Sequence, residues 1–161
     1  MSTTYLALGS NLNHPMHQIK TALKEIDKIP KTKRIATSQI YCTLPYGLKN
    51  QDNYLNMVVA LKTKLSPNNL LKLLQEIELK QGRIRYIERW GPRTIDIDIM
   101  LFENKLINTN DLIIPHYDMI NRVFMLLPLV QISPNIILPN GKRAKDILVT
   151  LDTSTIKICK I

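Results

Sequence analysis

The sequence predicts an α+β fold, a ferredoxin-like α/β sandwich with helices packed on a mainly antiparallel sheet. Two observations predict it. Apolar residues alternate over short segments, as in strands, and recur at spacings of three and four in longer ones, as in helices. The segments follow the order strand, helix, strand, strand, helix, strand, which is typical of that fold. The helices are too few to cover both faces, so we expect one covered face. The 161 residues fit a single domain, 1–161.

The first strand and the first helix are bounded by turn-forming residues. Residues 5–8 are a short apolar run that stops at Gly9, which is typical of a buried strand entering a loop. Pro15 suits the first turn of a helix, because its missing N–H has no intrahelical partner there. Apolar residues then recur at helical spacing until Pro30, which ends the helix.

Two strands separated by a loop are expected next. Residues 35–41 indicate an edge strand, and residues 43–53 a loop, because Pro45 and Gly47 favour turns. Residues 55–63 alternate, so their side chains point to opposite sides of the sheet. One side carries Leu55, Met57, Val59 and Leu61, and the other carries Tyr54, Asn56, Val58 and Ala60.

The second helix has signals at both ends. Ser66 is an N-cap residue before a first-turn proline, and Gly82 is suited to the left-handed conformation that ends helices. Gln75 and Glu78 lie side by side on a flank of this helix. Its inward-facing residues are Leu70, Leu73, Leu74 and Ile77.

The remaining elements follow an arginine-rich segment. Residues 82–93 are polar and predict a loop, whereas residues 95–99 alternate strictly between isoleucine and aspartate and predict a strand. Asp118 is placed to cap a helix over residues 119–127. Asn140 and Gly141 signal a tight turn near the C-terminus.

The formal net charge is +9, and the arginines are more informative than the lysines. The lysines are scattered, as on a solvated surface. Arg83, Arg85, Arg89 and Arg93 lie close together in the chain, and guanidinium groups bind phosphate through paired hydrogen bonds. The chain has no apolar run long enough to span a membrane, and its two cysteines form no disulfide or metal-ligand pattern. We therefore expect a cytoplasmic monomer that does not bind membranes.

Asp96 and Asp98 give the strongest chemical signal. Residues i and i+2 of a strand point to the same side, so the two carboxylates repel each other unless cations lie between them. Mg²⁺ held by carboxylates and substrate phosphates would satisfy them. A polar outer strand face is the other interpretation, but the nearby arginines favour phosphoryl transfer. Because the chain has no glycine-rich phosphate loop, side chains would hold a nucleotide triphosphate: Arg83, Arg85, Arg93 and Arg122.

Further candidate residues each have a structural alternative. His116, followed by Tyr117, could contact phosphate or ribose, or make only a local hydrogen bond. Tyr54 and Asn56 could stack on a flat heterocycle and read its edge, or belong to the core. Trp90 could cover a ligand as a flap, or anchor its loop.

Residues 89–100 read RWGPRTIDIDIM. This run resembles the signature of the 6-hydroxymethyl-7,8-dihydropterin pyrophosphokinase family of folate biosynthesis, and the resemblance extends along nearly the whole chain. Asn13 stands where the family commonly has glycine. The other motifs that carry the resemblance are Gly9-Ser10-Asn11-Leu12, Tyr41-x-Thr43-x-Pro45-x-Gly47, Tyr54-Leu55-Asn56, Pro115-His116-Tyr117 and Asn121-Arg122-x-Phe124.

The resemblance implies that ATP donates its pyrophosphoryl group to the hydroxymethyl oxygen of a reduced pterin, with AMP leaving. It also implies two Mg²⁺ ions bound by Asp96 and Asp98, and a Trp90 flap over the site. The expected catalytic residues are Arg83, Arg93, Asp96 and Asp98. The expected ATP-binding residues are Gln75, Glu78, Arg85, Trp90, Ile99, His116, Tyr117 and Arg122. The expected pterin-binding residues are Thr43, Pro45, Tyr46, Tyr54, Asn56 and Phe124, with Tyr54 and Phe124 on opposite sides of the ring.

Two other classes of protein compete with this interpretation. A ferredoxin-like RNA-binding module fits the charge of +9, but such modules expose aromatic residues on central strands, and residues 55–63 and 94–101 contain none. A metal-dependent nuclease could use the two aspartates, but it would give Tyr54, Asn56 and Phe124 no role. We therefore expect ATP and a reduced pterin as partners and no nucleic acid.

Overall fold

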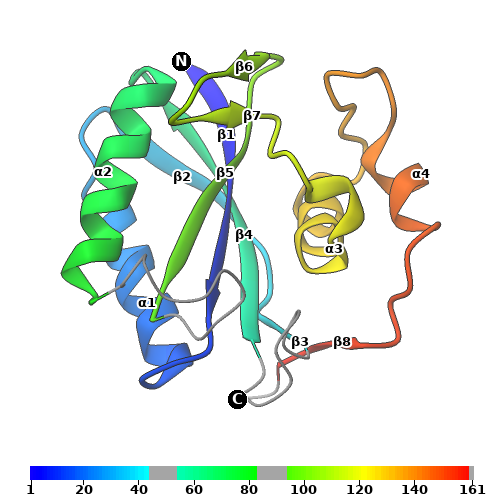
Figure 1. Cartoon of the computed structure of the whole chain (residues 1–161), viewed down its shortest axis with the longest axis horizontal. Coiled ribbons are helices and arrows are strands. Elements are labelled where there is room, and N and C mark those ends of the chain that lie inside the picture. The colour runs from blue at the N-terminus through cyan, green and yellow to red at the C-terminus, as the bar shows by residue number, and fades with distance from the viewer. Residues whose placement is uncertain (44–53, 83–93, 160–161) are drawn as a thin grey trace.

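The computed structural model describes residues 1–43, 54–82 and 94–159. In these ranges an antiparallel sheet lies between two layers of helices (Figure 1). One layer holds α1 (Pro15–Ile26) and α2 (Pro67–Lys80), and the other holds α3 (Val123–Ile132) and α4 (Ala144–Leu148). The predicted fold, helices packed on a mainly antiparallel sheet, is confirmed.

The order of the strands is that of a ferredoxin-like sheet with an added edge. The main sheet runs β5 (Asp96–Phe102), β1 (Ser2–Ser10), β4 (Tyr54–Thr63), β3 (Tyr41–Thr43) and β8 (Ile156–Ile158), and β2 (Thr32–Thr37) also pairs with β4. All of these pairs are antiparallel. The strands β6 (Ile107–Asn108) and β7 (Ile113–Ile114) form a separate pair.

The expectation that helices cover only one face is wrong. Met57, Val59 and Leu61 of β4 belong to the core beneath α1 and α2, whereas Val58 belongs to a second core that includes Leu126 of α3. The alternation predicted for β4 is therefore correct, and both of its faces are buried. The last apolar segment forms α3 and covers the second face, because its side chains are apolar nearly all round and cannot leave a polar side in water.

The end signals of α2 appear as predicted, whereas α1 ends at Ile26, before the predicted end at Pro30. The Ser66 hydroxyl accepts a hydrogen bond from the Asn69 N–H at 3.2 Å, which caps α2, and Gly82 adopts a φ of 85° just after it. Asn13, which stands where glycine is common, has a φ of 54°. Asparagine is one of the few residues other than glycine that adopt this conformation readily. Gly141 has a φ of 84° in the predicted C-terminal turn.

The predicted strand over residues 35–41 is two strands. β2 ends at Thr37 and β3 begins at Tyr41. Between them, the Ser38 hydroxyl accepts a hydrogen bond from the Val58 N–H at 2.9 Å. A side chain therefore takes the place of a backbone ladder partner, so the strand is interrupted.

The predicted helix over residues 119–127 is also divided. A 3₁₀ turn, η1, covers Met119–Asn121, and α3 starts only at Val123, because Arg122 is extended with φ −110° and ψ 104°. The Asp118 side chain makes no cap hydrogen bond to this helix, contrary to the prediction. It binds the side chains of Asn121 and Arg122 instead.

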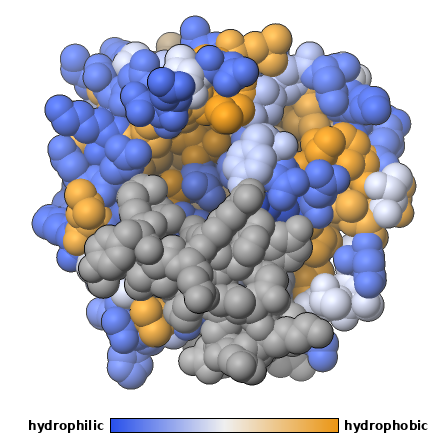
Figure 2. All heavy atoms as spheres, viewed as in Figure 1, coloured by the Kyte–Doolittle hydropathy of each residue, from blue (hydrophilic) through white to orange (hydrophobic). Residues whose placement is uncertain are grey.

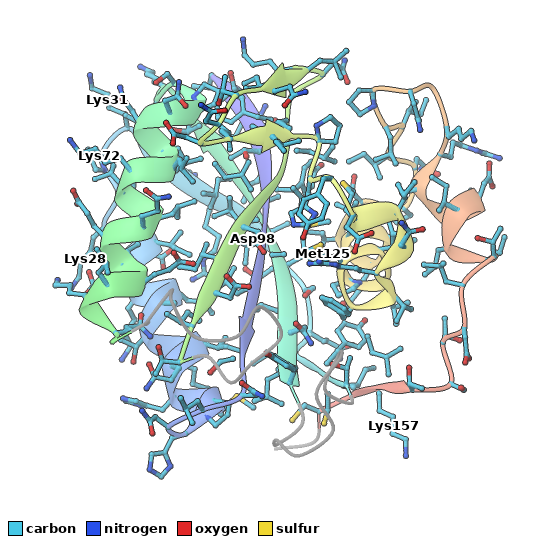
Figure 3. All side chains as sticks on the ribbon, in the orientation of Figure 1. Lys28, Lys31, Lys72, Asp98, Met125 and Lys157 are labelled. Carbon is cyan, nitrogen blue, oxygen red and sulfur yellow. The ribbon has the colours of Figure 1, made fainter. Side chains whose placement is uncertain are left out.

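The surface agrees with the interpretation of the lysines. Figure 3 shows Lys28, Lys31, Lys72 and Lys157 pointing away from the sheet. Figure 2 shows hydrophilic side chains over α2 and a hydrophobic floor in the hollow beside it. Among the described residues, no helix combines the length and the apolar character that a membrane crossing requires.

Candidate active site

Asp96 and Asp98 project from the same side of β5, as predicted. Asp96 lies opposite Gly9 and Asp98 opposite Ala7 of β1, while Ile97 between them is buried in the core beneath α1 and α2. The two carboxylates therefore lie on the face of the sheet that α3 partly covers, and Figure 3 shows Asp98 there beside Met125 of α3. The Asp98 side chain is 33% exposed, so a ligand can reach it.

Two side-chain contacts fix the beginning of β5. The N–H of Ile97 donates to Glu78 Oε2 at 2.8 Å, and Glu78 is only 1% exposed. The Ser10 hydroxyl donates to the carbonyl of Thr94. Because β5 is the last strand of its sheet on that side, its outward N–H needs a partner from another element. These contacts set the position of the backbone that carries the two aspartates.

Asn56 lies on the same face, one strand beyond β1. Gly9 pairs with Asn56 on one side and with Asp96 on the other, so the three residues form a row across the sheet. The Asn56 amide donates from Nδ2 to Thr43 Oγ1 at 3.0 Å. A Cβ atom on Gly9 would lie 3.0 Å from Asn56 Oδ1, so the glycine leaves room for this oxygen. The row therefore places the Asn56 amide on one side of Gly9 and the Asp96 carboxylate on the other, and Gly9 itself has no side chain to fill the space between them.

Arg122 lies within cation–π distance of two aromatic rings. The guanidinium carbon of Arg122 is 5.5 Å from the centre of the Tyr117 ring and 5.8 Å from that of Phe124. Arg122 is buried, Phe124 is half-buried at the start of α3, and Tyr54 is half-buried at the start of β4. Cation–π contacts of this kind stabilise a desolvated guanidinium.

His116 is held as a neutral ring. It stacks on Tyr117 with the ring centres 4.7 Å apart, and its Nδ1 accepts the N–H of Asp118 at 3.1 Å. Burial, aided by the nearby charge of Arg122, lowers the pKa of His116 to about 4. The proton of the neutral ring is then on Nε2, which lies 3.9 Å from Asp98 Oδ2. This contact is too long for a hydrogen bond and, with a neutral ring, is not an ion pair.

The other predicted residues fall into three groups. Ile99 is buried in the core beneath α1 and α2, and Gln75 is half-buried on α2. Glu78 is expected to bind the nucleotide; in the structure its carboxylate accepts a hydrogen bond from the backbone of β5. Six predicted residues lie outside the described residues: Pro45, Tyr46, Arg83, Arg85, Trp90 and Arg93.

Two residues of this site are not among the predicted site residues. Gly9 is predicted to end a strand and belongs to a family motif, but it has no predicted role in the site, although a strand glycine often marks a close approach. Asp118 was assigned to a helix cap, whereas its carboxylate binds the buried Arg122 at 2.9 Å. The spacing of four residues between them was the available signal, because side chains at that spacing meet in a helical turn.

The donor set fits a magnesium ion. Carboxylate oxygens are the ligands that Mg²⁺ prefers, and it is commonly bound by one or two carboxylates together with substrate phosphates. Within the described ranges, no group of three or more His, Cys, Asp or Glu side chains could enclose a metal. Asp96 and Asp98 therefore fit an ion whose coordination is completed by substrate oxygens.

Comparison with known proteins identifies the family. The sequence model of 7,8-dihydro-6-hydroxymethylpterin-pyrophosphokinase matches residues 5–134. The chain belongs to this family. It is 47% identical over 142 residues to the 2-amino-4-hydroxy-6-hydroxymethyldihydropteridine pyrophosphokinase of Haemophilus influenzae, covering 88% of each chain. It is 45% identical over 144 residues to the Pseudomonas aeruginosa protein of the same name, covering 89% of this chain and 88% of that one.

Solved structures support the fold. A Plasmodium falciparum HPPK-DHPS structure with pteroate matches with a TM-score of 0.74 at 16% identity, over 92% of this chain. The chain spans only 42% of the length of that protein, and at this identity the match shows the fold alone.

Membership of the pyrophosphokinase family confirms the predicted activity. The family transfers pyrophosphate from ATP to the hydroxymethyl group of the pterin in folate biosynthesis, and the chain is an ATP-dependent diphosphokinase. Nothing in these comparisons supports the alternative of an RNA-binding module.

Proposed function

We propose that the row of Asp96, Gly9 and Asn56 is the floor of the active site, with the triphosphate of ATP at the aspartate end and the pterin at the Asn56 end. The observation that carries this proposal is the register, because Gly9 pairs with both of the other residues on one face of the sheet. Neighbouring strands lie about 4.8 Å apart, so the two ends of the row are separated by about 10 Å. That span suits a bicyclic ring with its hydroxymethyl group directed at the phosphates.

Asn56 reads the edge of the pterin in this arrangement. Its Nδ2 donates to Thr43 Oγ1 at 3.0 Å, which fixes the orientation of the amide and presents Oδ1 above Gly9. An oxygen acceptor at this position suits the N–H groups of a pterin. Tyr54 and Phe124 contribute the aromatic faces against which the ring stacks.

Asp96 and Asp98 are the residues that would hold two Mg²⁺ ions. Mg²⁺ bound there would supply positive charge to neutralise the triphosphate during transfer. Glu78 and Ser10 hold the strand that carries both carboxylates. His116 offers an Nε2–H donor to a phosphate oxygen, because its Nδ1 already accepts the N–H of Asp118 and the proton of the ring is therefore on Nε2.

Four predicted residues outside the described ranges complete the nucleotide site: Arg83, Arg85, Trp90 and Arg93. We assign Arg83 and Arg93 to the charge that develops during transfer, Arg85 to the triphosphate, and Trp90 to a flap that excludes water. Pro45 and Tyr46 line the pterin side. The protein acts as a cytoplasmic monomer of one domain, and it needs neither nucleic acid nor a membrane.

The proposed roles are tested by incubating the protein with Mg-ATP and 6-hydroxymethyl-7,8-dihydropterin and measuring AMP and ADP. We expect AMP as the nucleotide product, and we expect Asp98→Ala to reduce its rate of formation by at least about a thousandfold, as for loss of a central charge-stabilising group. The variant should still bind an ATP analogue weakly. Retained Mg²⁺-dependent turnover in Asp98→Ala would overturn the assignment.

A matched control is Asp152→Ala. Asp152 is an exposed aspartate whose carboxylate accepts the N–H of Ser154 at 2.9 Å, on the segment before β8. It removes one carboxylate without touching the face of β5, so we expect its rate of AMP formation to stay within twofold of that of the wild type.

A further inference from the structure

Arg122 has an unusual environment for a charged residue. Only 8% of its surface is exposed, and its guanidinium carbon lies 5.5 Å from the ring centre of Tyr117 and 5.8 Å from that of Phe124. Removing a guanidinium from water is unfavourable unless an anion compensates for it. The Arg122 Nη2 group also donates to the Tyr117 hydroxyl at 3.2 Å, but a hydroxyl carries no compensating charge.

Asp118 supplies the compensating charge. Its Oδ2 accepts the Nε–H of Arg122 at 2.9 Å, and its Oδ1 accepts the Nδ2–H of Asn121 at 2.9 Å. The hydrogen bond from Asn121 and the neighbouring guanidinium lower the pKa of the Asp118 carboxyl, so it is ionised at neutral pH. The carboxylate is therefore held from both sides and cannot turn without breaking one of these contacts.

Asp118 also holds His116 through its backbone. Its N–H donates to His116 Nδ1 at 3.1 Å, which keeps the proton of the neutral ring on Nε2, the nitrogen nearer to Asp98. Asp118 thus contacts both His116, a candidate ATP-binding residue, and Arg122. This double contact exists because η1 turns the chain back between residues 118 and 122.

We propose that Asp118 is a positioning residue, which fixes the Arg122 guanidinium against both Tyr117, on the nucleotide side, and Phe124, on the pterin side. It touches neither substrate; it acts through Arg122. Without its charge, the guanidinium loses this ion pair and is held less firmly beside the rings of Tyr117 and Phe124. The inference rests on the proposed active site, with Phe124 at the pterin and with Arg122 and Tyr117 at ATP, as the family resemblance implies.

The test is Asp118→Asn, which keeps the backbone N–H to His116 and nearly the same shape but removes the charge. We expect kcat/KM for both substrates to fall by about 10- to 100-fold, as for loss of a charge-assisted hydrogen bond. In NMR spectra of protein labelled with ¹⁵N-arginine, the Nε–H signal of Arg122 should be slow to exchange in the wild type and should exchange rapidly in the variant. Asp118→Glu, which restores the charge, should recover part of the activity.

The control is Asp27→Asn. Asp27 accepts the Nε–H of Arg34 at 2.9 Å, the same contact on an exposed pair far from the site, so its loss should leave kcat/KM within twofold of the wild type. If Asp118→Asn does not fold, Asn121→Ala replaces it, because Asn121 is exposed and its loss frees one oxygen of Asp118. We expect a two- to fivefold fall in kcat/KM from this variant.

The proposal is overturned if Asp118→Asn, or Asn121→Ala in its place, keeps kcat/KM for both substrates within twofold of the wild type. It is also overturned if the exchange of the Arg122 Nε–H is unchanged in Asp118→Asn. A different result would show that the proposed active site is wrong: the wild type itself would form no AMP, or Asp98→Ala would remain active.

Discussion

Replacement of Gly9 by alanine tests whether the Asn56 amide reads the pterin. The new Cβ would lie 3.0 Å from Asn56 Oδ1 and 3.7 Å from the carbonyl oxygen of Leu55. The first distance is shorter than an ordinary van der Waals contact, so the amide must rotate or shift. Rotation lengthens or breaks its hydrogen bond to Thr43, which is 3.0 Å long.

The expected effect on stability is small, because two contributions oppose each other. A buried neutral hydrogen bond contributes about 0.5–1.5 kcal/mol. Alanine inside a strand is favoured over glycine by about 0.5–1 kcal/mol, because it loses less backbone entropy on folding. We therefore expect Gly9→Ala to change the free energy of unfolding in urea by less than about 1 kcal/mol.

The expected effect on the pterin is larger. A displaced amide removes at least one hydrogen bond to the ring, so the dissociation constant measured by calorimetry should rise about five- to tenfold. The affinity for an ATP analogue serves as the internal control, because no atom of Asp96 lies among the near neighbours of the new Cβ. Pterin affinity within twofold of the wild type, or an equal loss of affinity for both ligands, would refute this reasoning.

Three further predictions concern stability. Arg34 donates to both oxygens of Asp27, and this hydrogen bonding lowers the pKa of the Asp27 carboxyl from 3.8. The pair therefore stabilises the fold above that pH, and its contribution is lost as the pH falls through the lowered pKa. Asp27→Asn should lower the free energy of unfolding by about 0.5–1 kcal/mol at pH 7, since the pair is partly exposed, and by almost nothing in strong acid. Leu74→Ala should cost about 2–5 kcal/mol in urea unfolding, because Leu74 is fully buried between α2 and the sheet. Ser66→Ala should cost about 1 kcal/mol, because it removes the acceptor for the Asn69 N–H.

Each of these predictions has its own control. For Leu74 it is Leu79→Ala on the same helix, where the side chain is exposed and the loss should stay below about 0.5 kcal/mol. For Ser66 it is Ser66→Asp, which keeps an acceptor and should restore the stability. An Asp27→Asn effect that is the same at pH 7 and in strong acid would contradict the assignment to the carboxylate charge.

The sequence was sufficient to predict the elements whose signals are local. The alternation around Asp96 and Asp98 and the capping residues Ser66 and Gly82 depend on neighbours along the chain, and the structure agrees with them. The arrangement of the two aspartates on one face follows from the period of the strand alone.

The features that were missed depend on contacts between distant segments. Ser38 divides a strand only because its hydroxyl meets Val58 on β4, and no local pattern reveals that partner. Both faces of the sheet are buried because α3 packs on the second face. The sequence predicts a helix over residues 119–127 but does not show on which face of the sheet it packs. The buried charge of Arg122, which requires an anion beside it, is visible only once Tyr117 and Phe124 are placed around it.

The carboxylate of Glu78 against the N–H of Ile97 also has a consequence for association between molecules. A foreign strand that approached β5 would find this donor already occupied and would have to displace the buried Glu78 side chain to pair with it. Growth of the sheet from one molecule into the next is therefore blocked at the strand that carries Asp96 and Asp98. Glu78, which fixes the position of β5, therefore also disfavours aggregation through this strand.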